Sequence, residues 1–153
     1  MKIALGEPRA SAGFFIMINI NRDKLKLIEL AQQNDEVEVL WLYGSYAKES
    51  ANPNSDIDLA VVFKTWQEDI LERRLRSELL AISWQKLLNF GEGQLSVLDM
   101  EMAPIPIAMS VLTTGKLLLS KNSARQLQEQ QRIMSKWEID YLYHYQNKEA
   151  LYG

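Results

Sequence analysis

Cysteine is absent from this 153-residue chain, which excludes disulfides, thiolate metal sites and a cysteine nucleophile. The same absence fits the reducing cytoplasm, where we expect the protein to reside. The chain also lacks a basic stretch, and its formal net charge is −3, so it has no electrostatic footprint of a duplex-binding protein. No apolar run approaches the roughly 20 residues that cross a membrane, and Gly6-Glu7-Pro8 interrupts the apolar start, which argues against a signal peptide. We therefore expect neither direct DNA binding nor membrane association.

What is present is typical of one globular domain. Hydrophobic residues make up 47% of the chain and charged residues 24%, which are ordinary proportions, and the length is sufficient to bury a core. Residues 1–16 do not continue the pattern that follows, and Met17 begins a segment that reads like a natural start. We interpret residues 1–16 as an N-terminal extension. An edge strand at Phe14–Ile18 is the alternative, and the sequence leaves both open.

Hydrophobic periodicity and turn residues predict alternating helices and strands. The cluster Asn52-Pro53-Asn54-Ser55 is a turn, because each of these residue types disfavours the continuation of a helix or strand. The predicted helices are 21–34, 67–89, about 107–114 and a tail at 123–145, and the predicted strands are 37–43, 56–63, 94–100 and 116–119. This order predicts an α/β (α+β) fold in which helices pack on a small mixed β-sheet.

The predicted helix 67–89 carries one apolar stripe at steps of four, four and three residues. Its members are Leu71, Leu75, Leu79 and Ile82, and a second stripe on the far side comprises Leu80, Trp84 and Leu87. Arg73 and Arg76 lie opposite the first stripe, and a basic face of this kind is expected to be solvated. The functional alternative is that these cations contact a triphosphate or a partner.

The stretch LWLYGSYAKESANPNSDIDLAVVF (40–63) joins two apolar runs through polar residues. Asp56 and Asp58 lie two apart at the head of the second run, so a strand projects both carboxylates from one face. Two like charges held together are unfavourable unless something offsets them, and carboxylate oxygens are ligands that Mg²⁺ prefers. Gly44-Ser45 leaves a strand and is expected to enter a helix, whose first N–H groups bind phosphate. The stretch therefore suggests nucleotide chemistry.

Gly-Ser, ten residues and then Asp-x-Asp resembles the signature of the DNA polymerase β-like nucleotidyltransferase superfamily. More narrowly, GSYAKESANPNSDIDLAVVF resembles the minimal nucleotidyltransferases of the MntA type, the antitoxins of HepT/MntA (type VII) toxin–antitoxin systems. The resemblance implies a polymerase β-like nucleotidyltransferase domain at 17–120. Residues 121–153 would be a C-terminal helical tail that packs on this domain or on a partner.

The resemblance also implies roles for individual residues. Gly44 and Ser45 would hold the nucleotide phosphates, and Asp56 and Asp58 would be catalytic and bind Mg²⁺. Lys48 stands where an Arg is usual, which keeps a charge for phosphate binding and loses the planar fork.

Glu49 replaces a common Gly at a position that is expected to need a positive φ.

A third carboxylate on a neighbouring strand usually completes the superfamily's site. Alignment through Ala103-Pro104 puts Ser96 at that position, and Asp99 falls where a second, less central acidic residue is common. A regular strand places Ser96 and Asp99 on opposite faces, because they are an odd number of residues apart. Asp99 would join the catalytic residues only if the alignment slips or the strand bulges.

The function that the resemblance implies is an adenylyltransferase antitoxin. It would use ATP and Mg²⁺ to transfer AMP to a tyrosine hydroxyl of a cognate HepT-type HEPN ribonuclease toxin, with which it would form a complex. One alternative is a non-catalytic, nucleotide-binding antitoxin that masks the toxin, which Ser96 favours. The other is a nucleotidyltransferase that acts on a small molecule, although such enzymes generally carry an additional helical domain.

Overall fold

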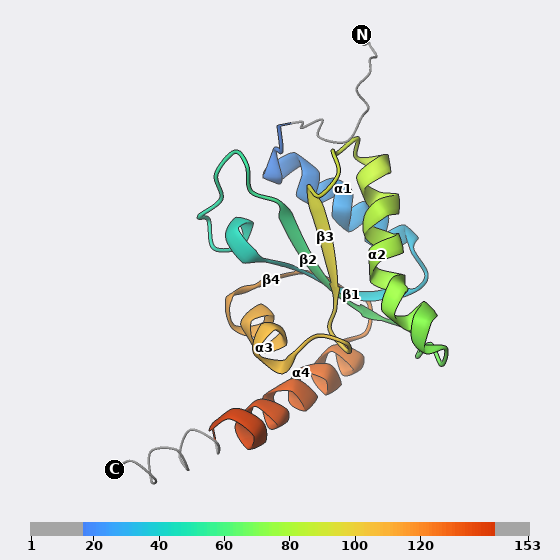
Figure 1. The fold of residues 1–153 in the computed structure, drawn as a ribbon, viewed down its shortest axis with the longest axis vertical. Helices are drawn as coiled ribbons and strands as arrows, with labels where there is room; N and C mark the ends of the chain where they lie inside the picture. The colour runs from blue at the N-terminus through green and yellow to red at the C-terminus, as the bar shows by residue number, and fades with distance from the viewer. Residues whose placement is uncertain (1–16, 143–153) are drawn as a thin grey trace.

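A computed structural model describes residues 17–142, which form a four-stranded sheet with helices on both faces (Figure 1). The strand order is β3-β2-β1-β4, with β1 antiparallel to both of its neighbours and β2 parallel to β3. The prediction of a small mixed sheet packed by helices is therefore confirmed. The predicted N-terminal extension, and the alternative strand up to residue 16, lie outside the described residues.

The elements follow the predicted order, with ends that shift by a few residues. The helices are α1 (Ile20–Gln33), α2 (Ile70–Leu87), α3 (Ile105–Thr114) and α4 (Ser123–Trp137), and the strands are β1 (Val37–Tyr43), β2 (Ile57–Phe63), β3 (Leu95–Asp99) and β4 (Lys116–Ser120). Two single turns complete the described chain: a 3₁₀ turn, η2 (Gly44–Tyr46), and a π-helical turn, η3 (Glu138–Leu142). No helix in residues 17–142 has the length and apolar character needed to cross a bilayer.

The strand β2 is buried on both faces and separates two hydrophobic clusters. Ile57, Leu59 and Val61 belong to the cluster under α1 and α2, whereas Ala60 and Val62 belong to the cluster under α3 and α4. Alternate residues of a strand point to opposite faces, so a nearly continuous apolar run is the sequence of a strand that is covered twice. This double coverage fixes which residues of β2 remain exposed at its head.

The helix α2 packs on the sheet with a different face from the one that its apolar periodicity predicts. Leu80 and Trp84 are buried as expected of the second stripe, but Leu87 is exposed. The side chains of the first stripe all face solvent: Leu71, Leu75, Leu79 and Ile82 are 66, 39, 62 and 48% exposed. We call these four residues the α2 stripe.

The two arginines opposite the α2 stripe explain this orientation. The guanidinium of Arg76 lies over the Phe63 ring at 4.0 Å from its centroid, and Arg73 lies over Trp66 at 4.2 Å. Arg76 also donates a hydrogen bond from Nη1 to the Thr65 carbonyl (2.9 Å), so the long side chain buries its stem while its head keeps a hydrogen-bond partner. The expectation of a solvated basic face is therefore wrong for these two residues.

The tail helix α4 packs on α3. Ile133 is fully buried in the cluster beneath α3, and Glu129 is buried between Arg125 and Arg132, with which it forms ion pairs. Trp137, at the end of α4, stacks on Tyr141 with 5.2 Å between ring centroids. The rest of the predicted helix, from residue 143, lies outside the described residues.

The inward orientation of Arg76 predicts a measurable contribution to stability. We expect Arg76→Ala to lower the free energy of unfolding by roughly 1–3 kcal/mol, because it removes the stacking on Phe63, the bond to Thr65 and a cation 4.0 Å from the buried Asp99. The matched control is Arg74→Ala on the same helix, which is exposed and should cost less than about 0.5 kcal/mol. Equal losses in urea denaturation would contradict the assigned orientation.

Candidate active site

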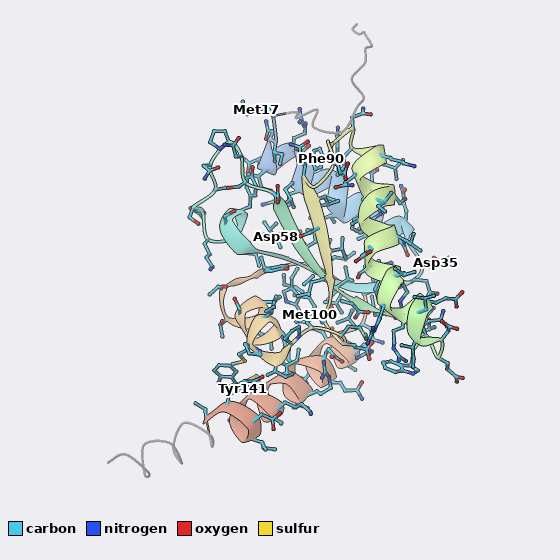
Figure 2. All side chains as sticks on the ribbon, in the orientation of Figure 1. Met17, Asp35, Asp58, Phe90, Met100 and Tyr141 are labelled. Atoms are coloured by element: carbon cyan, nitrogen blue, oxygen red, sulfur yellow. The ribbon has the colours of Figure 1, made fainter. Side chains whose placement is uncertain are left out.

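Asp56 and Asp58 stand at the head of β2, where the strand emerges from the core. Asp58 is partly exposed on the face that carries Ala60 and Val62, and Asp56 precedes the first strand residue and is exposed. Desolvation raises the pKa of Asp56, and the negative charge of Asp58 raises it further. The two carboxylates are therefore close enough to repel each other, as the two-residue spacing predicts. Figure 2 places Asp58 between η2 and β3.

The turn before Asp56 is built by other residues. The Asn52 side chain accepts a hydrogen bond from the Asn54 N–H (2.8 Å), and the Ser55 hydroxyl accepts one from the Asn52 N–H (2.9 Å). The side chains of Asn52 and Ser55 thus close the predicted turn. The Asp56 carboxylate takes no part in these two hydrogen bonds.

Gly44 brings the backbone against Asp58 in a way that no other residue allows. Its φ is +72°, and an added Cβ would overlap the Asp58 carboxylate, whose Cγ lies 3.2 Å from the ideal Cβ position. Both the left-handed backbone and the close approach require glycine. Gly44 and Ser45 open only a three-residue 3₁₀ turn, so the expected helix and its dipole are absent at this point.

The loop after this turn carries the two residues that depart from the family pattern. Lys48 is exposed, and its backbone N–H donates to the Gly44 carbonyl at 3.1 Å. Glu49 has a φ of 59°, which confirms the expected positive φ, and its carboxylate pairs with Lys116 at 3.2 Å. The loop is thereby anchored to β4.

Ser96 lies directly beside Asp58 on the neighbouring strand. The parallel register pairs the two residues, and the Ser96 hydroxyl donates a hydrogen bond to Asp58 Oδ1 at 2.7 Å. A hydroxyl, and not a carboxylate, therefore lies beside Asp58 at the position to which the resemblance assigns the third carboxylate.

Asp99 is not brought to the site. It pairs with Val61, three residues further along β3, and the register from Ile57 to Val61 is regular. Its side chain is buried on the α2 side, where the Glu101 N–H donates to Oδ1 at 3.0 Å and Arg76 lies 4.0 Å from Oδ2. Burial raises the pKa of Asp99, while these two contacts lower it. The strand does not bulge at this point, so the structure places Asp99 away from Asp56 and Asp58, in contrast to the catalytic role that is expected only if the alignment slips or the strand bulges.

Two tyrosines at the site were not predicted. Tyr43 pairs with Asp58 across β1 and β2, and its burial and the Asp58 charge raise its pKa. Tyr46, in η2, has a pKa raised by burial and by the charges of Asp23 and Asp56. The position of Tyr43 at the end of β1, directly before Gly44, indicates this place, because in an antiparallel pair the end of the first strand lies beside the start of the second, where Asp58 stands.

The side chains at this site fit a divalent cation held by two carboxylates. The negative charge of Asp58 raises the pKa of Asp56, so the two carboxylates repel each other, which is the situation that a bound cation relieves. Within residues 17–142, no group of three or more His, Cys, Asp or Glu side chains is placed to hold a metal ion. The remaining ligands would have to be water or substrate oxygens, as is common for Mg²⁺.

Comparison with known proteins places this geometry in a family. Residues 25–124 match the family described as polymerase beta, nucleotidyltransferase. The protein adenylyltransferase MntA of Shewanella oneidensis is 32% identical over 94 residues, which are 61% of this chain and 62% of that protein. The chain thus spans less than two thirds of the length of this curated relative.

Two solved structures share the fold at low sequence identity. One is a toxin–antitoxin complex with AMP-PNP, of which the matching chain has a TM-score of 0.62 and 20% identity, covering 87% of this chain and 99% of that one. The other contains a tri-AMPylated Shewanella oneidensis HEPN toxin with an MNT antitoxin, at a TM-score of 0.61 and 18% identity, covering 88% and 100%. These likenesses show the fold alone.

The repulsion between the two carboxylates predicts that Asp56 destabilises the folded state. A carboxyl whose folded pKa exceeds its unfolded pKa binds more protons when folded, so its ionisation costs stability as the pH rises through the window between the two values. We expect Asp56→Asn to melt slightly above the wild type at pH 7, with a smaller difference at pH 4. Thermal denaturation without divalent cations measures this.

The matched control is Asp69→Asn, in which the exchanged side chain caps α2 by accepting the Glu72 N–H. Asparagine caps a helix about as well as aspartate, and the loss of charge at a helix start is mildly unfavourable. This control should melt at or slightly below the wild type. A lower melting temperature for Asp56→Asn than for Asp69→Asn would refute the repulsion.

Proposed function

The chain belongs to the polymerase β nucleotidyltransferase family, and from this membership we propose that it is a protein adenylyltransferase that acts as an antitoxin. The donor is ATP, and the acceptor is a tyrosine hydroxyl of a HEPN ribonuclease toxin, which the modification neutralises. The similarity to the protein adenylyltransferase MntA and to chains from toxin–antitoxin complexes supports this choice of donor and acceptor. Because the donor is ATP, the reaction would take place in the cytoplasm.

One observation carries the proposal: Gly44 holds the backbone against the Asp58 carboxylate. A left-handed glycine in contact with a carboxylate at a strand head brings backbone N–H groups and negative oxygens into one small volume. Phosphate oxygens accept hydrogen bonds from such N–H groups, and a cation that bridges the phosphates binds the carboxylate oxygens. This combination of groups favours the binding of a nucleoside triphosphate over a purely structural role for the turn.

The proposed step is an in-line displacement at the α-phosphorus of ATP. The tyrosine oxygen forms a bond to that phosphorus, the bond to the bridging oxygen of the β-phosphate breaks, and pyrophosphate leaves with the electron pair. The hydroxyl proton passes to solvent, because the described site places no third carboxylate beside Asp56 and Asp58. The products are tyrosyl-AMP and pyrophosphate.

The chain's own residues have distinct roles in this proposal. Asp56 and Asp58 would hold Mg²⁺, which when bound neutralises charge on the phosphates. Gly44 and Ser45 would contact the phosphates, and the exposed Lys48 would offer a cation to them. Ser96 orients the Asp58 carboxylate through its hydrogen bond.

A second candidate function is a binding antitoxin that masks the toxin without modifying it. The observation that favours it is the hydroxyl of Ser96 at the position of the usual third carboxylate. Such a protein would keep the nucleotide site and lack an efficient base for the acceptor. The two candidates differ in whether protection of cells depends on Asp56 and Asp58.

The first experiment follows the label from ATP. With Mg²⁺, α-labelled ATP and the HEPN toxin encoded in the same genome, we expect the toxin to acquire label. The double variant Asp56→Asn with Asp58→Asn should reduce the rate at least about 100-fold, because phosphate charge is then left unopposed. Circular dichroism checks that the variant remains folded.

The outcomes separate the two candidates. If the wild type never labels a toxin that an adenylyltransferase of known activity does label, the transfer proposal is wrong. If the double variant also protects cells as well as the wild type, the masking function replaces it.

A third carboxylate introduced at position 96 tests the two-carboxylate site. We expect Ser96→Asp to bind Mn²⁺ in the presence of an ATP analogue about 10-fold more tightly than the wild type, because its added negative charge lies beside Asp58. Ser96→Asn has nearly the same size without the charge and should bind no more tightly than the wild type. Isothermal titration calorimetry measures both variants, and equal affinities for Asp and Asn at this position would contradict a metal at Asp58.

A further inference from the structure

The hydroxyl of Ser96 lies beside the carboxylate at which the proposed transfer would occur. It donates a hydrogen bond to Asp58 Oδ1 at 2.7 Å, and the regular pairing of β2 with β3 sets both side chains on one face of the sheet. The other oxygen of this carboxylate, Oδ2, lies on the side of Gly44, where the loop proposed to hold the phosphates begins. Ser96 and this loop therefore flank the same carboxylate.

The direction of this hydrogen bond leaves the Ser96 oxygen able to react. A hydroxyl has one hydrogen and two lone pairs, and Ser96 gives its hydrogen to Asp58. The lone pairs of Oγ, which would attack a phosphorus atom, take no part in this bond. Ser96 is also exposed, so its oxygen faces the open side of the site rather than the core. The geometry thus presents an oxygen nucleophile inside the site.

The other hydroxyl groups close to the carboxylates are placed less favourably. Tyr43 is half-buried and packs against the cluster under α3 and α4, and Tyr46 packs against the cluster on the opposite face of the sheet. Ser45 belongs to the loop that would contact the phosphates. Among these groups, Ser96 is the exposed hydroxyl that shares both a face and a hydrogen bond with Asp58.

We infer that Ser96 is a site of self-adenylylation, at which the chain takes the AMP of its own bound ATP when no other acceptor is present. This inference rests on the proposed function, because it gives that function's donor a second acceptor within the chain. Ser96 Oγ forms a bond to the α-phosphorus, and the bond from that phosphorus to the oxygen bridging to the β-phosphate breaks. Pyrophosphate leaves with the electron pair, the hydroxyl proton passes to solvent, and the products are adenylyl-serine and pyrophosphate.

Proximity sets the rate of this step, and the space beside Asp58 sets its consequence. A serine hydroxyl is a weak nucleophile, but an oxygen held next to the reacting group acts at an effective concentration on the order of 10⁵ M or more in favourable geometry. The added AMP then occupies the space beside Asp58, and the hydrogen bond to Oδ1 is lost with the hydroxyl hydrogen. Self-adenylylation would therefore switch off a chain that meets ATP without its acceptor.

Mass spectrometry of the full chain, incubated with ATP and Mg²⁺ without toxin, locates the modification. We expect one adenylyl group per chain, on the peptide that contains Ser96. Ser96→Thr should still be labelled at position 96, because it keeps a hydroxyl, and Ser96→Ala should not. The matched control is Ser83→Ala, which removes an exposed serine of α2 on the opposite face of the sheet and should be labelled as the wild type is.

The place of Ser96 inside its own site predicts a reaction in cis. The first-order rate constant of labelling should stay the same, within about twofold, when the concentration of the chain is raised tenfold. The double variant Asp56→Asn with Asp58→Asn should remain unlabelled when it is mixed with the wild type. Labelling of this variant by the wild type, or a rate constant that rises with chain concentration, would overturn the inference.

Calorimetry gives a readout that does not depend on turnover. We expect the fully adenylylated wild type to bind α,β-methylene-ATP, whose α–β bridge is not cleaved, at least tenfold more weakly than the unmodified chain. The reason is that the AMP on Ser96 occupies the space beside Asp58. Equal affinities before and after modification would contradict a modified residue inside the nucleotide site.

The inference and the proposed function fail in different ways. A chain that labels the toxin but carries no label on Ser96, or carries it on another residue, would overturn the inference and leave the proposed function standing. A chain that labels Ser96 and never labels the toxin would support the inference and remove the toxin as the acceptor. A chain that labels neither contradicts both.

Discussion

The register of β2 against both of its neighbours is the constraint on which the site depends. Asp58 is paired with Tyr43 on the antiparallel side and with Ser96 on the parallel side, so three side chains stand in a row across the sheet. A slip of one residue in β2 would turn Asp58 into the core and Ile57 out of it. Because the strand is buried on both faces, its apolar residues fix this register, and the carboxylates inherit their position from the core.

The helix α2 shows that periodicity alone does not decide which face of a helix is buried. An arginine carries a long apolar stem and a planar head, so Arg76 can cover Phe63 while its head reaches the Thr65 carbonyl and the neighbourhood of Asp99. The α2 stripe on the opposite face contributes little hydrophobic free energy to folding, because its side chains stay exposed to solvent. A helix that is apolar on its outer face is therefore stabilised further by any surface that covers that face.

Much of the fold and part of the candidate site could be predicted from the sequence, for reasons that differ between elements. The apolar runs of β1 and β2 and the turn at Asn52–Ser55 follow from local chemistry. The place of Ser96 beside Asp58 follows from the resemblance, through the alignment at Ala103-Pro104. The burial of Arg76 could not be read, because it depends on Phe63 and Thr65, which come from another element. At Gly44 the sequence predicts a helix and the structure has a 3₁₀ turn, because a Gly-Ser step at the end of a strand is compatible with both.

The hydroxyl of Ser96 gives the site less negative charge than a third carboxylate would. Asp56 and Asp58 already repel each other, and a third carboxylate beside Asp58 would add a further unfavourable charge whenever no cation is bound. Ser96 instead donates a hydrogen bond to Asp58, which steadies that carboxylate without adding charge. Under the proposed function, the cost would fall on cation affinity and on removal of the acceptor proton, both of which a carboxylate would favour. In the proposed transfer, an acceptor held in the orientation for attack would partly offset a weak base, because that orientation lowers the entropic part of the barrier.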